Sequence, residues 1–262
     1  MRIPYFQINA FSSNSFGGNP AGVCVLQTWL PDPTLKSIAA ENDLSETAFL
    51  VRRETLFELR WFTPAVEVDL CGHATLASAF ALFFELGYDQ QSIQFETKSG
   101  RLTASRRDDL IELDFPSRPP TPCAPPARLL EGLGSKPSEV LRSRDYLAVF
   151  NSPAEVAALK PNFDLLRQLD SLGIIVTARD QQADFVSRFF APAAGIDEDP
   201  VTGSAHCTLI PFWSERLGKQ EMFAKQISKR SGELFCRMLG DRVGIGGRAI
   251  VYLRGEIEYN SS

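Results

Sequence analysis

Hydrophobic and polar positions alternate over several short stretches of the chain, and this period predicts β-strands. Alternating or continuously apolar stretches cover residues 56–62, 66–70 and 185–190. Further predicted strands cover residues 92–96, 101–105, 110–115, 222–228, 233–238 and 242–246. The pattern therefore predicts sheets in both the first and the second half of the chain.

Two stretches carry the period of a helix instead. From Ala74 to Leu86, apolar residues at positions 76, 79, 80, 83 and 84 form the stripe of a core-facing helix, which Gly87 would cap. The second predicted helix runs from Ala205 to Leu217 and contains Pro211. We expect a kink there, because proline removes a backbone hydrogen-bond donor.

The two halves of the chain resemble each other in sequence. RWFTPAVEVD (60–69) aligns with RFFAPAAGID (188–197), CG (71–72) with TG (202–203) and KSGRL (98–102) with RSGEL (230–234). The spacing between these pairs is nearly constant and their order is kept, which indicates an internal duplication. It grows by three residues after the first match, which predicts that Glu198, Asp199 and Pro200 were inserted into the second copy.

A proline-rich stretch at 116–127 separates the halves and predicts a boundary there. We expect an N-terminal half at 1–116 and a C-terminal half at 117–262, with the last strand able to pack on the first half. The predicted fold class is α+β, with two similar domains that each wrap a bent, mostly antiparallel sheet around a long helix. Their equivalent faces are expected to meet at a cleft.

Composition and charge exclude several classes of protein. The net charge of −5 and the absence of a Lys/Arg cluster argue against a nucleic-acid partner. The longest apolar run, residues 74–84, is too short to cross a bilayer, which takes about 20 residues. Five scattered cysteines are typical of reduced thiols. We therefore expect a cytoplasmic protein without a membrane partner.

Gly72 and Gly203 stand where the two predicted helices begin. The first turn of a helix leaves backbone N–H groups unpaired, so two such ends facing one cleft would bind a carboxylate. Each glycine alone is explained equally well by a tight turn. Their recurrence in both copies favours an anion pocket.

Both histidines of the chain, His73 and His206, fall in these two loops. We expect His73 to face the cleft and move protons, whereas His206 fits a structural role. The neighbouring Cys71 and Cys207 invite a zinc interpretation, but Thr202 stands in the place of Cys71 in the second copy. The spacing is also unusual for zinc ligands, and no nucleotide motif is present, so we expect neither a metal nor a cofactor.

Two acids are not explained by the repeat. Glu46 aligns with Ile174, so a carboxyl group occupies a position that is apolar in the other copy. Such a group is costly without a partner or a function, and it suits a general acid/base. A solvated strand face is the alternative. Asp199 is the second such acid, with helix capping as its alternative role, whereas Asp197 and Glu198 fit solvated acids.

The motifs GGNPAGV (17–23), LSETAF (44–49), WFTPAVEVDLCGHAT (61–75) and DPVTGSA (199–205) resemble the PhzF-like proteins of phenazine biosynthesis. The resemblance covers almost the whole chain and implies the diaminopimelate epimerase-like fold and a homodimer. It implies a cofactor-free isomerase in which Glu46 shuttles a proton. His73 and Asp199 would also be catalytic, and the substrate would be bound by Asn19, Gly72, Gly203 and Ser204.

The leading hypothesis is an isomerase that shifts a proton on a small carboxylated metabolite. An epimerase or racemase using Glu46 and Cys71 is the first alternative, in which the proton returns to the carbon it left. A symmetrical reaction with two thiols is disfavoured, because Thr202 replaces the second cysteine. A homologue that binds small molecules without catalysis is the second alternative.

Overall fold

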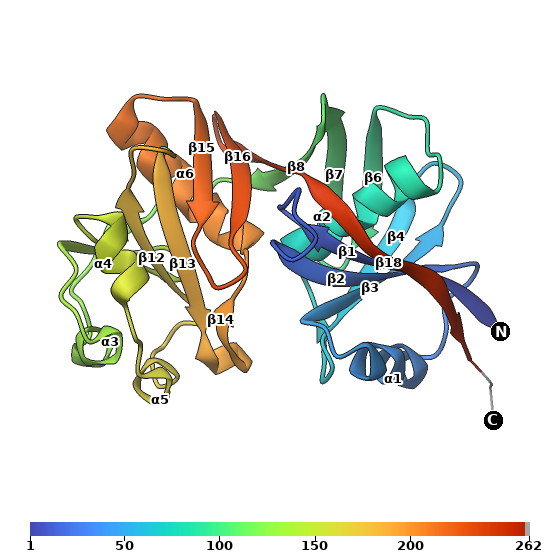
Figure 1. Cartoon of the computed structure of the whole chain (residues 1–262), viewed down its shortest axis with the longest axis horizontal. Helices are drawn as coiled ribbons and strands as arrows, with labels where there is room; N and C mark the ends of the chain where they lie inside the picture. Colours follow the sequence, from blue (N-terminus) through green and yellow to red (C-terminus); the bar gives the residue numbers. More distant parts are fainter. Residues whose placement is uncertain (260–262) are drawn as a thin grey trace. The chain divides into compact units, whose positions relative to one another are not determined.

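The computed structural model describes residues 1–259, and the chain forms two compact units (Figure 1). Unit 1 consists of residues 1–114 and the chain from Gly246 onward, and unit 2 consists of Phe115–Ile245. Each unit has its own helices and its own buried core. None of the helices in the described residues is long and apolar enough to span a membrane.

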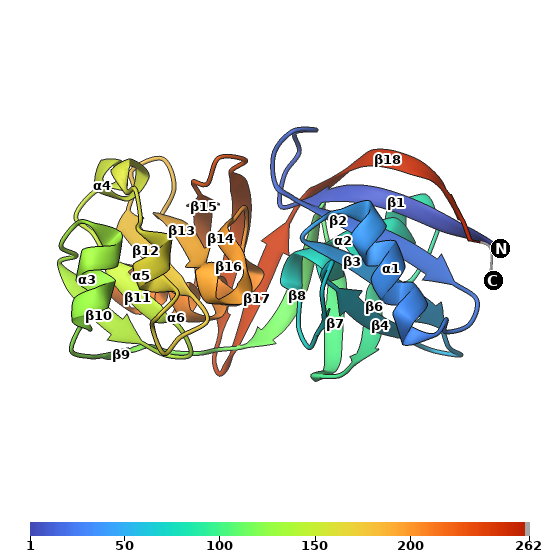
Figure 2. The ribbon, with the colours of Figure 1, turned by 90° about the horizontal axis from the view of Figure 1, so that it is seen from below.

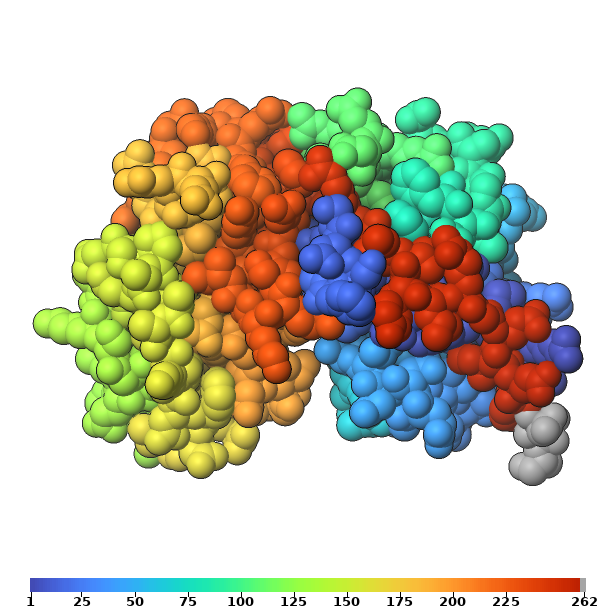
Figure 3. All heavy atoms as spheres, viewed as in Figure 1, coloured from blue at the N-terminus to red at the C-terminus, as the bar shows by residue number. Residues whose placement is uncertain are grey.

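Unit 1 carries a mixed sheet, in which parallel and antiparallel neighbours alternate from β2 to β7. Its strands are β1 (Arg2–Ala10), β2 (Asn19–Leu26), β3 (Glu46–Arg52), β4 (Phe57–Phe62), β5 (Glu67–Val68), β6 (Ser92–Thr97), β7 (Gly100–Arg107), β8 (Leu110–Pro116) and β18 (Ala249–Glu258). β2 is parallel to β3, β3 antiparallel to β4, β4 parallel to β6, and β6 antiparallel to β7. β18 pairs with β1, and much of it is exposed, as the red band in Figure 3 shows.

The two faces of this sheet are covered by different helices. α1 (Asp32–Asn42) packs on β3 and β4 (Figure 2), and its Leu35 shares a core with Phe49 and Val51 of β3. Side chains alternate along a strand, so Glu46 and Ala48 belong to the opposite face. α2 (Gly72–Phe80) contacts β1, β2 and β3. Alternation thus places Glu46 on the sheet face opposite α1.

The helix expected at Ala74–Leu86 is confirmed in place but differs at both ends. It begins at Gly72, and after Phe80 it continues as a π-helical turn, η1 (Ala81–Glu85). The expectation that Phe84 faces the core is wrong, since its side chain is 50% exposed. The wider π turn changes the angular spacing of the residues that follow it. Phe84 lies against the Arg106 guanidinium instead.

Unit 2 repeats this order of pairings. Its strands are β9 (Thr121–Pro122), β10 (Glu139–Arg142), β11 (Tyr146–Val149), β12 (Ile174–Arg179), β13 (Phe185–Ala191), β14 (Ile196–Asp199), β15 (Glu221–Gln226), β16 (Gly232–Leu239) and β17 (Arg242–Gly247). Its helices are α3 (Ala127–Leu133), α4 (Pro153–Ala158), α5 (Phe163–Leu166), η2 (Pro192–Ala194) and α6 (Gly203–Leu217). β11–β12 is parallel, β12–β13 antiparallel, β13–β15 parallel and β15–β16 antiparallel. This agreement supports the inferred duplication, which remains an inference.

An arginine–glutamate ion pair recurs at the same place in both units. Arg60 of β4 donates to both carboxylate oxygens of Glu67 in β5, at 2.7 and 2.8 Å. Arg188 of β13 does the same to Glu198 of β14, at 2.7 and 2.9 Å. The prediction that Glu198 is a solvated acid is therefore wrong, because a bidentate partner holds it. Asp197, at 60% side-chain exposure, does fit a solvated acid.

The paired arginines also align the two sheets. Arg60 stands opposite Phe49 on β3, and Arg188 stands opposite Val176 on β12. The sheet faces agree with this alignment. Phe49 shares a core cluster with α1 in unit 1, and Val176 shares a core cluster with α3, α4 and α5 in unit 2. The sequence alignment was correct between β4 and β13 but one residue out of register between β3 and β12. A one-residue slip is hard to detect where a strand is apolar on both faces, but it reverses every side chain.

In this register Glu46 corresponds to Gly173, and the predicted match with Ile174 is wrong. A Cβ atom at Gly173 would lie 2.1 Å from Cζ of Phe189. The space that a side chain would need at this position is thus filled by an aromatic ring. The difference between the halves is larger than predicted, because one has a glutamate and the other has no side chain at all.

The predicted insertion of Glu198, Asp199 and Pro200 is wrong in position as well. Val68 pairs with Trp61 in unit 1, and Asp199 pairs with Phe189 in unit 2. Asp199 therefore stands in the place of Val68, as a replacement and not as an inserted residue. The three additional residues lie in the longer turn between 190 and 198, which includes η2.

Candidate active site

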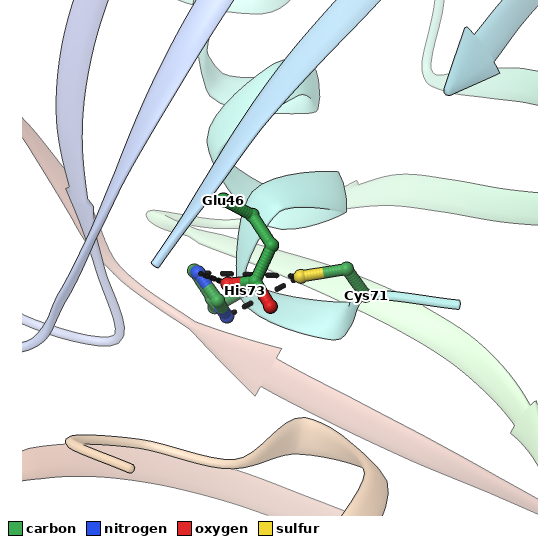
Figure 4. A group of neighbouring side chains, drawn as sticks. All are labelled: Glu46, Cys71 and His73. Carbon is green, nitrogen blue, oxygen red and sulfur yellow. Dashed lines mark hydrogen bonds and ion pairs between the residues drawn. The ribbon is translucent and has the colours of Figure 1, made fainter. Parts of the chain in front are cut away.

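Three reactive side chains of unit 1 converge beside the start of α2 (Figure 4). Glu46 is the first residue of β3, His73 is the second residue of α2, and Cys71 directly precedes the helix. His73 Nε2 lies 3.2 Å from Glu46 Oε2, and His73 Nδ1 lies 3.5 Å from Cys71 Sγ. The imidazole thus contacts both a carboxylate and a thiol. We call these three residues the triad.

The triad is largely shielded from water. Side-chain exposure is 6% for His73 and 13% for Glu46, and Cys71 is 6% exposed. The contact between Glu46 and His73 is an ion pair. Within the described residues, Glu46 Oε2 accepts no aligned hydrogen bond. A buried acceptor of this kind is costly to leave unsatisfied, and it is free to receive a proton from a bound molecule.

The charges of the triad follow from burial and from its neighbours. Burial by itself lowers the pKa of His73, but the Cys71 sulfur and the Glu46 carboxylate raise it, and the pKa ends well above its ordinary value. Burial raises the pKa of the Cys71 thiol, and the Glu46 carboxylate raises it further. His73 therefore holds its proton more tightly than an ordinary imidazole, and Cys71 holds its proton more tightly than an ordinary thiol.

The triad also has the donor types of a metal site. One ligand atom from each residue lies within 4.8 Å of the others. Thiolate, imidazole and carboxylate are the ligands that zinc prefers. The zinc interpretation considered from the sequence used the two Cys–His pairs, whereas in the structure Glu46 joins Cys71 and His73.

The start of α2 has backbone donors that a carboxylate can use. The helix begins at Gly72 after an extended Cys71, whose side chain does not cap it. Among the described residues, the first turn of α2 contains no acid that would neutralise its positive end. Asn19 is fully buried at the start of β2, two residues before Ala21, the partner of Glu46. Asn19 and Glu46 therefore belong to the same sheet face.

In unit 2 the predicted residues cluster at the start of α6. Asp199 Oδ2 accepts a hydrogen bond from the Thr202 hydroxyl, so it binds a side chain and does not cap the helix through this contact. Gly203 is the first residue of α6, and the hydroxyl of Ser204 accepts a hydrogen bond of 3.4 Å from Arg144. The structure therefore brings Asp199, Gly203 and Ser204 into one region of unit 2.

Sequence reasoning missed Gln226, which holds this region together. The Gln226 side chain is fully buried and accepts a hydrogen bond of 2.8 Å from the Thr202 backbone N–H. Its amide donates to the Asp199 carbonyl at 2.8 Å and to the Thr202 hydroxyl at 3.2 Å. The sequence signal that could have identified Gln226 is its position as a polar residue at the end of the alternating strand β15.

His206 has the structural role expected of it. The ring is fully buried, Nδ1 donates to the Thr202 carbonyl at 2.8 Å, and Phe185 lies 6.0 Å away between ring centroids. Burial lowers the pKa of His206 to about 4, so the ring is neutral. Its environment differs from that of His73, which has a carboxylate beside it.

A surface groove of about 630 Å³ lies elsewhere in unit 1. It is lined by residues that include Arg52, Glu54 and Tyr88. None of the described triad residues lines this groove, and its charged side chains are not gathered around a reactive group. The triad is the better candidate, since its atoms are close enough to exchange protons.

Comparisons with known proteins identify the family of the chain. Residues 8–255 match the family described as phenazine biosynthesis-like protein. The chain belongs to the phenazine biosynthesis-like, or PhzF, family. It is 50% identical to an uncharacterized isomerase of Pseudomonas aeruginosa, over 98% of this chain and 99% of the other. The family relationship supports an isomerase or epimerase of the PhzF type.

Solved structures confirm the fold predicted from the sequence. A PhzF family protein of Enterococcus faecalis is 43% identical and matches with a TM-score of 0.97, covering 99% of this chain and 100% of that one. A probable proline racemase of Agrobacterium radiobacter shares the fold at 11% identity, with a TM-score of 0.64 over 98% and 93% of the two chains. The α+β, epimerase-like architecture is thereby established.

Proposed function

We propose that this protein is a cofactor-independent isomerase that shifts a proton between two carbons of a small carboxylated metabolite. The observation that carries the proposal is the position of Glu46, a shielded carboxyl group 3.2 Å from the His73 imidazole, whose pKa is raised. The unit-2 alignment supports it, because the corresponding residue is Gly173, so the carboxylate is specific to one half. An acid that the packing of the repeated fold required would be expected in both halves.

The chemistry needs one group that both takes and returns a proton. Glu46 accepts a proton from a C–H bond of the substrate, the electron pair moves into the conjugated system, and the proton is returned to a carbon two positions away. The imidazolium of His73 offsets negative charge that develops next to Glu46. The uncapped amides at the start of α2 hold the substrate carboxylate. The reaction conserves atoms and electrons, because the substrate is rearranged and Glu46 ends in its starting form.

The spacing inside the triad favours this reaction over an epimerisation by Glu46 and Cys71. Two bases on opposite sides of one carbon each lie roughly 3–3.5 Å from it, which puts them about 6–7 Å apart. The ligand atoms of Glu46 and Cys71 lie within 4.8 Å of each other. A substrate carbon does not fit between them without movement of one side chain.

The test measures deuterium uptake from heavy water by NMR, with a panel of small unsaturated carboxylates that includes a dihydro-hydroxyanthranilate. Glu46→Gln should lose roughly 10²–10⁴-fold in exchange rate while it retains ligand binding. Glu58→Gln is the matched control, because Glu58 lies in the same sheet and is paired with Arg53 and Trp29. Undiminished exchange by the Glu46→Gln protein would contradict the proposal.

Asp199, Gly203, Ser204 and Asn19 are proposed to bind and orient the same substrate. Their support is the family resemblance of the motifs that carry them and, for Asp199, its replacement of the apolar Val68. A cytoplasmic, homodimeric protein remains a prediction from the sequence. Size-exclusion chromatography with light scattering would test the dimer.

A further inference from the structure

We propose that the triad of Glu46, Cys71 and His73 binds one Zn²⁺ ion, and that the bound ion inhibits the enzyme. The binding site stands on the geometry alone. The inhibition rests on the proposed function, since a coordinated Glu46 cannot take a proton from a substrate. Zinc is here an inhibitor and not a cofactor, so the metal-free protein is the active form.

The distances between donor atoms fit a tetrahedral ion. Zinc–ligand bonds of about 2.3 Å to sulfur and about 2.0–2.2 Å to nitrogen or oxygen separate tetrahedral ligands by roughly 3.5 Å for S–N and about 3.3 Å for N–O. Cys71 Sγ and Glu46 Oε2 lie 4.0 and 3.2 Å from His73 Nε2. Because Cys71 Sγ lies 3.5 Å from His73 Nδ1, binding through Nε2 requires the thiol to rotate away from Nδ1 toward the Nε2 side of the ring.

The surroundings of the triad favour a metal over a merely polar cluster. Glu46 Oε2 is buried and, among the described residues, accepts no hydrogen bond, so a ligand oxygen is already available. Cys71 and His73 are two residues apart around the start of a helix, which fixes their relative position. The remaining exposure of Glu46, 13%, gives an ion and a fourth ligand from water a route to the site.

Binding changes the protons of the site in a balanced way. The Cys71 thiol and the His73 imidazolium each release one proton to the solvent when sulfur and Nε2 bind the ion. His73 Nδ1 keeps its proton. The Glu46 carboxylate gains a bond to the metal and loses its role as a proton acceptor. No oxidant or reductant takes part.

The experiment uses Co²⁺ as a spectroscopic probe on the purified, metal-free full chain. We expect one Co²⁺ per chain and a thiolate-to-cobalt charge-transfer band in the near ultraviolet, which Zn²⁺ abolishes by displacement. Cys71→Ser should lose the band and bind Zn²⁺ at least tenfold more weakly. His73→Gln should also bind Zn²⁺ at least tenfold more weakly. Cys207→Ser is the matched control, because Cys207 is also a buried thiol beside a histidine, and it should retain the band.

A wild-type protein without the band, or a band that survives in Cys71→Ser, would overturn the metal site. The wild-type measurement decides this even if a variant fails to fold. In the second arm, Zn²⁺ should stop deuterium exchange in proportion to its occupancy, and EDTA should restore it. Exchange that continues in the zinc-loaded protein overturns the inhibition alone. Exchange that is independent of Glu46 overturns the proposed function, while the band still reports the metal site.

Discussion

Glu46 Oε2 and His73 Nε2 lie 3.2 Å apart, although 26 residues of chain lie between Glu46 in its strand and His73 in its helix. The first residue of β3 and the second residue of α2 meet because the helix packs on the sheet face to which Glu46 belongs. Burial would normally keep a histidine neutral. Beside Cys71 and this carboxylate the pKa of His73 instead rises well above its ordinary value.

We predict that the two histidines of the chain carry different charges at pH 7, His73 protonated and His206 neutral. With only two imidazole rings, nitrogen NMR of the metal-free protein resolves both. The raised pKa of His73 means that its proton stabilises the folded state below about pH 6.5, and that this contribution is lost as the pH rises through the folded-state pKa. A neutral His73 at pH 7 would contradict the prediction.

His73→Gln should reduce the exchange rate at least tenfold, because the positive charge beside Glu46 is removed. The glutamine keeps a hydrogen-bond donor of similar length, so the fold should be retained. His206→Gln, a change to the other buried histidine, is the control, and its exchange rate should remain within a few-fold of wild type.

Asp199→Asn should damage substrate binding and turnover together, because the proposed work of Asp199 is orientation and not proton transfer. The Thr202 hydroxyl can still donate to the asparagine oxygen, so the loop before α6 should hold. Steady-state kinetics and calorimetric titration on wild type and variant measure both effects. A fall in kcat with unchanged KM would instead place Asp199 in the chemical step.

Gly173→Ala should destabilise the protein by about 1–3 kcal/mol, because the new methyl group would overlap the ring of Phe189. Urea unfolding at neutral pH measures the free-energy change. Gly255→Ala on the exposed strand β18 is the control, with the nearest atom 3.7 Å from the added Cβ. It should change the free energy of unfolding by no more than about 0.5 kcal/mol. Equal effects of the two substitutions would refute the role assigned to Phe189.

Acid should destabilise the protein through His206. Its pKa is lowered to about 4 in the folded state, so the unfolded chain binds the proton first as the pH falls. The contribution of His206 to stability is therefore largest above pH 6.5 and is lost between pH 6.5 and 4, by roughly 3 kcal/mol in total and about 1 kcal/mol by pH 5.5, while protonated His73 opposes the loss. Urea unfolding of wild type and His206→Gln at pH 7 and 5.5 isolates the His206 contribution as the difference between the two proteins. His206→Gln should show a smaller loss over the same interval.

The sequence by itself determined the family, the helix after each turn glycine, and the most plausible acid/base. Its motifs are local, and the 3.6-residue and two-residue hydrophobic periods are each read within one helix or strand. Glu46 and His73 could therefore be proposed as site residues before their contact was known. The order and spacing of the motifs, which resemble those of the PhzF-like family, also predicted the epimerase-like fold, which the solved relatives confirm.

Only the tertiary structure decided how the two halves correspond. Gly173 as the counterpart of Glu46, and Val68 as that of Asp199, follow from the pairing of backbone groups between strands. Sequence similarity does not contain this information, because apolar strand residues substitute for one another while a slip of one residue reverses the sheet face. The ion pair of Glu198 and the buried contacts of Gln226 were hidden for a related reason. Both depend on segments of chain that the fold brings together. The Glu198 carboxylate and the Gln226 amide are stable at partly or fully buried positions because the fold supplies their hydrogen-bond partners.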